Sequence, residues 1–77
     1  MRILVVEDDP ILSHHLKVQL TELGNTIQLA NTAKEGLYQA QHYPIDIAII
    51  DLGLPDEDGI SLIKNIRKTG IKRRFLF

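Results

Sequence analysis

The chain has 77 residues, of which 44% are hydrophobic and 25% charged, and it contains no cysteine. This composition is typical of one small soluble globular domain and excludes collagen-like, disordered and coiled-coil classes. The missing cysteines exclude disulfide frameworks and thiolate zinc sites, and no apolar run approaches the roughly 20 residues of a membrane span. Because no secretory pattern opens the sequence, we expect a cytoplasmic protein without membrane contact.

Charge is divided unevenly along the sequence, although the formal net charge is only −1. Residues 1–59 contain ten acidic and three basic residues, giving −7, whereas residues 60–77 contain six basic residues and no acidic one, giving +6. A basic segment of this kind can contact nucleic acid, but lysines and arginines at helix ends are the more common explanation. We therefore expect no DNA contact by this chain itself.

The first 24 residues predict one strand and one helix. Residues 3–6 form an uninterrupted apolar run, which is typical of a strand covered on both faces in a parallel sheet. Asp9 and Pro10 then supply an N-cap and a first helical residue. The leucines that follow recur at helical spacing as far as Gly24, which we expect to end the helix.

The next stretch repeats the order of strand, helix and strand. Residues 26–30 predict a second strand, and residues 45–50 a third, mostly apolar one. Between them, Thr32 and Glu35 form a predicted capping box at the start of a short helix. This helix is expected to end before Pro44, because proline disfavours helical backbone in the residue before it.

A third helix is expected at about residues 60–69, with Gly70 as its stop. Alternation of strands and helices with short connections predicts right-handed crossovers between parallel strands. The expected fold class is therefore α/β, an open parallel sheet with helices on both faces. The sequence contains neither a GxGxxG nor a P-loop motif, so the dinucleotide and nucleoside-triphosphate cradles are excluded.

Carboxylates follow two of the predicted strands at the points where these strands end. Glu7, Asp8 and Asp9 follow the first strand, and Asp51 follows the third. Ligands of open α/β sheets bind at the carboxyl ends of the strands, so we expect these side chains to share one pocket. Clustered like charges need a cation, and ligands that are all oxygens favour Mg²⁺. Asp9 is explained by its cap role, whereas Asp51 has no helix start beside it.

Three motifs in order carry a resemblance to a known family. Residues 5–9 (VVEDD), 49–55 (IIDLGLP) and 58–59 (DG) together resemble the receiver domain of bacterial two-component response regulators, and are similar to the PhoP-type branch of the OmpR/PhoB-like subfamily. The resemblance implies the flavodoxin-like strand order 2-1-3-4-5. It covers residues 1–70, a partial receiver domain truncated after its third βα unit, and leaves residues 71–77 as an aberrant or partial fourth strand.

The resemblance also implies a role for each site residue. Asp51 would be the phosphoryl acceptor, taking phosphate from a sensor histidine kinase in a signalling protein that is not an enzyme. The implied ligands of Mg²⁺ are Glu7, Asp8, Asp51 and the backbone carbonyl of Gly53. Pro55 and Gly59 would shape the loop after Asp51. Transcription would be regulated through a C-terminal DNA-binding domain that this sequence does not contain.

Two alternatives remain at this point. The chain could be a truncated remnant or interaction fragment without switch activity, and a frameshift would explain the unusual residues 72–77. It could also be an aspartate-nucleophile phosphatase, although Gly53 stands where that group typically has a second aspartate. Without a true fourth strand, the third strand would present an open apolar edge, through which we expect association or aggregation.

Overall fold

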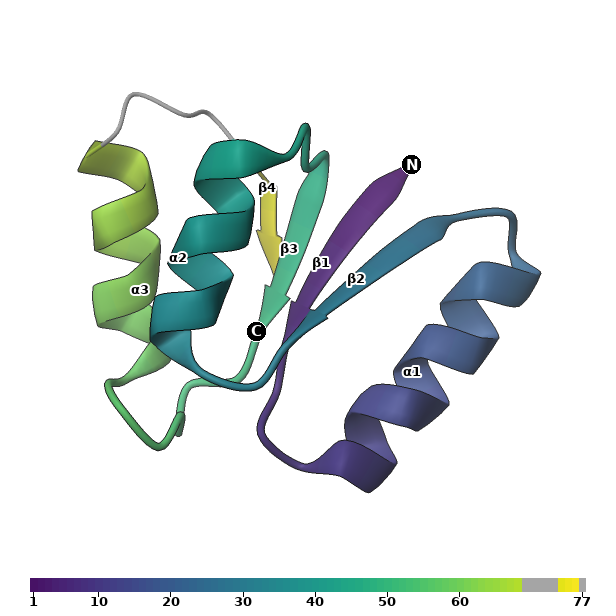
Figure 1. The fold of residues 1–77 in the computed structure, drawn as a ribbon, viewed down its shortest axis with the longest axis horizontal. Coiled ribbons are helices and arrows are strands. Elements are labelled where there is room, and N and C mark those ends of the chain that lie inside the picture. The colour runs from purple at the N-terminus through teal and green to yellow at the C-terminus, as the bar shows by residue number, and fades with distance from the viewer. Residues whose placement is uncertain (69–73, 77) are drawn as a thin grey trace.

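The computed structural model describes residues 1–68 and the backbone of residues 74–76. The elements in chain order are β1 (Arg2–Val6), α1 (Pro10–Glu22), β2 (Thr26–Ala30), α2 (Ala33–His42), β3 (Ile47–Ile50), α3 (Gly59–Lys68) and β4 (Arg74–Leu76). Every strand pairing is parallel, and the sheet has the order β2-β1-β3-β4 (Figure 1). The predicted fold class and strand order are confirmed for these strands, while the helix stop expected at Gly70 lies outside the described residues.

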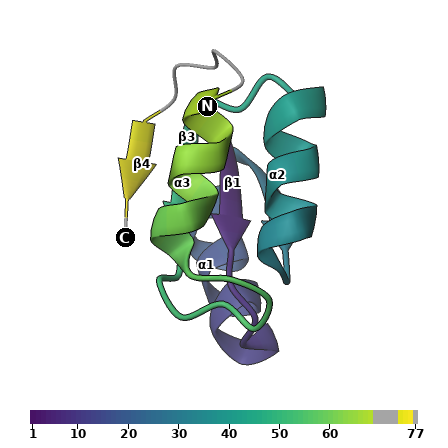
Figure 2. The same ribbon diagram turned by 90° about the vertical axis from the view of Figure 1, so that its left-hand side faces the viewer.

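The helices are divided between the two faces of the sheet. α2 and α3 pack side by side over one face, and α1 lies on the opposite side, beside β2 and β1 (Figure 1). Figure 2 shows α2 and α3 in front of the strands, with β4 at the edge of the sheet. The predicted arrangement of helices on both faces is therefore confirmed, with α2 and α3 on one face and α1 on the other.

The hydrophobic core fills the space between the sheet and the pair α2 and α3. Alternate strand residues point to this face, as expected from the two-residue period of a strand. The strand members of the core are Leu4, Val6, Ala30, Ala48 and Ile50. The helices and loops contribute Ala33, Ala40, Ile45, Leu54, Leu62, Ile63 and Ile66. Burial of these aliphatic side chains is the main stabilising contribution to the fold.

α1 covers its face of the sheet much less completely. Among the described residues of this helix, Ser13 alone is buried. Leu12 remains 43% exposed and Ile11 81% exposed, although both lie in the apolar segment of the helix. No helix in the described part of the chain combines the length and the apolar character that crossing a bilayer requires.

Local caps set the ends of the helices. Asp9 is the N-cap of α1, where its Oδ1 accepts a hydrogen bond from the Ile11 N–H at 2.9 Å. Gly24 follows the helix with φ of 90°, a left-handed conformation that favours glycine. Thr32 Oγ1 accepts from the Glu35 N–H at 3.2 Å, but the Glu35 carboxylate accepts from the Asn31 N–H instead of completing the predicted capping box.

The expectation of an open outer edge on β3 is wrong for the described backbone. Residues 74–76 pair with β3 from Ile47 to Ile49, so that β4 occupies the place next to β3. The reason is that this short segment adopts extended backbone in parallel register, which satisfies the outward peptide groups of β3. Association through the sheet edge, now formed by β4, and the domain boundary at residue 70 stay predictions.

Candidate functional site

The parallel pairing of β1 with β3 places two acidic residues side by side. Val6 is opposite Ile50 in the register, so Glu7 and Asp51 are the next residues of two neighbouring strands. The Asp51 N–H donates to the Val6 carbonyl at 2.9 Å, which extends the ladder by one bond. Both side chains are therefore held at the carboxyl edge of the sheet, where open α/β folds bind ligands.

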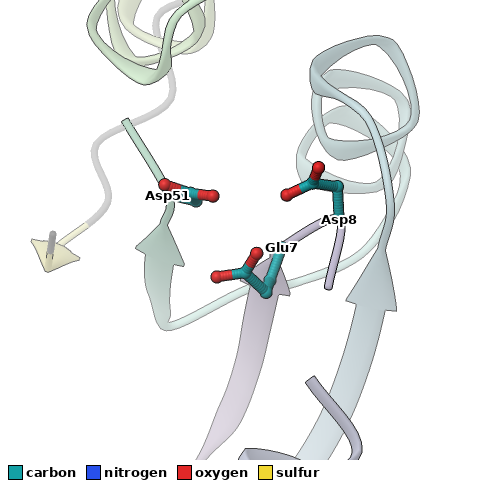
Figure 3. Close-up of side chains that lie close together, drawn as sticks. All are labelled: Glu7, Asp8 and Asp51. Atoms are coloured by element: carbon teal, nitrogen blue, oxygen red, sulfur yellow. The ribbon is translucent and has the colours of Figure 1, made fainter. Parts of the chain in front are cut away.

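Three carboxylates converge at this edge. One oxygen from each of Glu7, Asp8 and Asp51 lies within 4.8 Å of the other two. Figure 3 shows their side chains pointing toward a common space from the end of β1 and the end of β3. Glu7 and Asp51 are half-buried and Asp8 is exposed. The structure therefore brings together three of the four carboxylates that the sequence predicted to share this edge, and Asp9 is the exception.

Asp9 is separated from this acidic site although it directly follows Asp8 in the sequence. Its side chain caps α1, and its own N–H donates to Glu7 Oε2 at 3.1 Å. The run of three acids therefore splits into two residues that face the site and one that starts the helix. The N–H of Asp9 helps to orient Glu7, so the start of α1 also shapes the site.

Electrostatics in the acidic site favour a proton or a cation. The pKa of Glu7 is raised, first because the carboxyl group is desolvated and further because Asp8 and Asp51 lie beside it. The N–H of Asp9 opposes this rise by stabilising the charged form. Three negative groups in this space repel one another, and a bound cation would relieve the repulsion.

The donor set fits a hard divalent cation. All three side chains offer oxygen, and neither His nor Cys belongs to the cluster in the described part of the chain. Carboxylate oxygens are the ligands that Mg²⁺ prefers, and Mg²⁺ typically takes only one or two of them together with waters and phosphate oxygens. The site residues are therefore suited to Mg²⁺ and to a phosphoryl group beside it.

The loop after Asp51 folds back closely on it. The Gly53 N–H donates to Asp51 Oδ1 at 3.0 Å, which fixes the orientation of the carboxylate. Gly59 begins α3, and a Cβ there would lie 2.5 Å from the Asp51 carbonyl oxygen and 2.9 Å from Ile50 Cγ2. Glycine is therefore required at this position by close approach. Pro55, the other residue expected to shape the loop, is exposed within it.

An apolar groove extends from the acidic site between α1 and the sheet. It has a volume of about 370 Å³ and includes Glu7 and Asp51 among its lining residues. Its apolar lining is formed by Val5, Val6, Leu12, Leu16, Ile49, Ile50 and Leu52. The sequence did not predict this groove. Helical spacing of leucines predicts an apolar face on the helix, but it does not predict how closely that face packs against the sheet.

Two further acids in the loop make contacts that the sequence analysis did not predict, although residue 58 belongs to the DG motif. Asp58 Oδ1 accepts from the Ser61 N–H at 2.8 Å at the start of α3, and its spacing before an apolar periodic segment was a usable capping signal. Asp56 accepts from the N–H groups of Ala33 and Lys34 at the start of α2. No local pattern predicts that contact, because its partners lie 22 and 23 residues away.

The fold and the acidic site together define a receiver domain. The family model described as "Response regulator receiver domain" matches residues 3–76, and the chain belongs to this family. A receiver domain is a signalling domain and not a classical enzyme. The family match therefore favours the receiver interpretation over the aspartate-nucleophile phosphatase considered from the sequence.

Curated relatives narrow the resemblance within this family. The chain is 52% identical over 71 residues to the virulence transcriptional regulatory protein PhoP of Salmonella typhimurium, and equally to the transcriptional regulatory protein PhoP of Escherichia coli K12. Each alignment covers 92% of this chain and 32% of the relative. The predicted similarity to PhoP-type regulators is confirmed, and the chain spans about a third of the length of these relatives.

Solved structures agree with the fold. The non-phosphorylated HemR receiver domain of Leptospira biflexa superposes with a TM-score of 0.91 at 36% identity, covering 99% of this chain and 61% of that one. The response regulator TrrA of Thermotoga maritima, solved in complex with Mg²⁺-BeF, superposes with a TM-score of 0.90 at 32% sequence identity, covering 96% of this chain and 64% of that one. A chain of the complex between the histidine kinase ThkA and TrrA superposes with a TM-score of 0.89 at 32% identity, with the same coverage of 96% of this chain and 64% of that one.

Proposed function

We propose that this chain accepts a phosphoryl group on Asp51 from a sensor histidine kinase in the cytoplasm. The observation that carries the proposal is the convergence of Glu7, Asp8 and Asp51 at the carboxyl edge of the sheet, within 4.8 Å. The receiver family match and the similarity to TrrA, whose structure with a histidine kinase is known, support it. In a longer parent protein, a DNA-binding domain outside this chain would convert phosphorylation into regulation of transcription.

The proposed reaction is an in-line transfer of a phosphoryl group. A carboxylate oxygen of Asp51 attacks phosphorus, the new O–P bond forms, and the P–N bond of the phosphohistidine breaks. The electron pair of that bond returns to the imidazole nitrogen of the kinase. The product is an aspartyl phosphate, so the domain is a phosphoprotein that assists its own modification rather than turning over a substrate.

Residues of this chain prepare Asp51 for that reaction. The Gly53 N–H holds Asp51 Oδ1 at 3.0 Å, so the carboxylate is oriented before a donor arrives. Glu7, Asp8, Asp51 and the Gly53 carbonyl are the proposed ligands of Mg²⁺. When bound, the ion supplies positive charge that offsets the charge on the transferred phosphoryl oxygens. The complex of TrrA with Mg²⁺-BeF supports this assignment.

The proposal is tested by phosphorylation with a small donor. The chain is incubated with Mg²⁺ and acetyl phosphate, and the intact mass is measured before and after the incubation. We expect one added phosphoryl group in the unmodified chain and in Asp46→Asn, and none in Asp51→Asn. Asp46 is a matched control because it lies just before β3, at the opposite end of that strand from Asp51.

The main alternative is a remnant or interaction fragment that keeps the acidic site without accepting phosphate. A folded chain that gains no phosphoryl group under these conditions contradicts the proposal and supports this alternative. Circular dichroism of the same sample shows whether it is folded. Steady release of inorganic phosphate without an adduct would instead support a hydrolase.

A further inference from the structure

The loop of residues 52–58 is closed at its neck by backbone contacts. Gly53 and Asp58 form an isolated antiparallel bridge, and the Gly59 N–H donates to the Leu52 carbonyl at 3.0 Å. Leu54, 8% exposed, anchors the first half of the loop in the core. These contacts fix the two ends of the loop. Its tip lies between them, where Glu57 Oε1 accepts from the Asn65 side chain of α3 at 3.4 Å and a second anchor holds the loop to α2.

Asp56 supplies that anchor by reaching across to α2. Its Oδ1 accepts from the Ala33 N–H at 2.8 Å and its Oδ2 from the Lys34 N–H at 3.0 Å. The first N–H groups of a helix have no partner within the helix, and a carboxylate there also interacts favourably with the helix dipole. The two N–H groups hold the pKa of Asp56 below its ordinary value, which agrees with a charged carboxylate in this contact.

The first turn of α2 is therefore capped twice. Thr32, the local N-cap, accepts from the Glu35 N–H, whereas Asp56 takes the two N–H groups that Thr32 does not reach. The N–H groups in the first turn of a helix can also be satisfied by water. What Asp56 adds beyond satisfying them is a link between the loop after Asp51 and α2.

We propose that Asp56 is a positioning residue that fastens the tip of the 52–58 loop to α2 and thereby holds Gly53 against Asp51. The inference rests on the proposed role of Asp51 as phosphoryl acceptor. α2 is a firm support because Ala33 and Ala40 are buried in the core, at 1% and 2% exposure. The hydrogen bonds of Asp56 go to Ala33 and Lys34, so its effect on Asp51 is transmitted through the loop, whose first part carries the Gly53 N–H.

The experiment compares Asp56→Ala with two matched controls. Thr32→Ala removes the local cap of α2 and leaves the loop attached. Glu57→Gln removes the same charge one residue further along the loop and keeps an oxygen that can accept from the Asn65 side chain of α3. Amide hydrogen exchange and the NMR resonance of the Gly53 N–H are measured without metal, and the phosphorylation rate with acetyl phosphate is measured over a series of Mg²⁺ concentrations.

In Asp56→Ala we expect exchange at Ala33 and Lys34 to accelerate by about fivefold, the equivalent of one lost cap. We also expect a shifted Gly53 resonance and a phosphorylation curve displaced several-fold to higher Mg²⁺. Asp56→Asn keeps one accepting oxygen, so its exchange rates and its Mg²⁺ dependence should lie between those of Asp56→Ala and the unmodified chain. Thr32→Ala should accelerate exchange at Glu35 while leaving Gly53 and the Mg²⁺ dependence unchanged, and Glu57→Gln should resemble the unmodified chain.

Two results would overturn the inference. Unchanged exchange at Ala33 and Lys34 in Asp56→Ala would show that Asp56 does not protect these N–H groups. Faster exchange with an unchanged Gly53 resonance would show that Asp56 caps α2 without influencing the position of Gly53 beside Asp51. If the unmodified chain takes up no phosphoryl group, the proposed function fails, but the exchange and the Gly53 resonance still decide the positioning role.

Discussion

The two faces of the sheet differ in how completely they are covered. On the face of α2 and α3, Leu62 and Ile66 are fully buried against strand residues such as Leu4 and Ile50. On the face of α1, the helix buries only Ser13 among its described residues, and an apolar groove remains beside the sheet. Most of the stabilising burial therefore lies on one side of the molecule.

The acidic site joins these two unequal halves. Asp51 continues into the loop and helix of the well-covered face, where Leu54 is buried. Glu7 and Asp8 lead into α1, the helix with little cover. Formation of the site therefore depends on two differently packed regions. Asp51 is joined to the well-buried face of α2 and α3, whereas Glu7 and Asp8 are joined to the more exposed helix α1.

The largest expected effect comes from removing a core side chain on the covered face. Leu62→Ala should lower the free energy of unfolding by about 2–5 kcal/mol, since it leaves a cavity among fully buried neighbours. Ile11→Ala on α1, where the side chain is 81% exposed, should change it by less than about 0.5 kcal/mol. Urea unfolding measures both, and equal losses would contradict the difference between the faces.

A methyl group on the acceptor side tests the close packing around Asp51. Gly59→Ala should cost about 1–3 kcal/mol, because the added Cβ meets the Asp51 carbonyl oxygen at 2.5 Å. At Gly53 a Cβ would meet only Asp51 Oδ1 at 3.9 Å, an ordinary contact. Thermal unfolding should therefore show a large loss for Gly59→Ala and a small one for Gly53→Ala; a reversed order would refute the packing described here.

Mg²⁺ should stabilise the folded chain, because its proposed ligands come both from the end of β1 (Glu7 and Asp8) and from the end of β3 (Asp51). At a concentration ten times its dissociation constant, the gain should be about 1.4 kcal/mol, from mass action on the folded state. In Asp51→Asn the gain should shrink, and the metal-free variant should be more stable than the unmodified chain because one of three like charges is gone. Melting curves with Mg²⁺ and with a chelator test this, and an equal gain in Asp51→Asn would contradict it.

The smallest expected effect is a change in the acid sensitivity of the fold. The pKa of Asp56 is lowered in the folded state by the Ala33 and Lys34 N–H groups, and that of Asp58 by Ser61. The unfolded chain thus binds more protons, so the stability from these contacts is present above about pH 5 and is lost as pH falls through the folded pKa.

Asp56→Asn should flatten the fall in stability between about pH 5 and pH 2, because the titrating group is removed. Urea unfolding at several pH values in that range gives the slope. Glu57→Gln serves as the control for general loss of negative charge, and the slope in Asp56→Asn should be flatter than in this control. A slope in Asp56→Asn that equals the control would show that the contact contributes nothing.

Much of the site was predictable from the sequence because its geometry follows from topology. Apolar runs ending in Glu7 and Asp51 predict two parallel strands, and neighbouring parallel strands end at the same edge. The cap role of Asp9 was readable from Pro10 beside it. The need for glycine at position 59 came from the resemblance, and its physical reason, the Asp51 carbonyl, required coordinates.

What was not predictable depends on contacts between distant segments. The bonds from Asp56 to α2 join residues more than twenty positions apart, and their formation depends on the path of the loop. The exposure of α1 was equally hidden, since its leucines have the spacing of a buried face. Periodicity identifies which side chains are able to be buried, whereas the neighbouring elements decide whether they are.

The most direct test of the central claim locates the modified residue chemically. The chain is treated with Mg²⁺ and acetyl phosphate and then reduced with borohydride, which converts an acyl phosphate into an alcohol, and its peptides are mapped by mass spectrometry. The account predicts homoserine in place of Asp51 and unmodified Glu7 and Asp8. Homoserine at another position, or unreduced aspartate at position 51 in a folded chain, would contradict it.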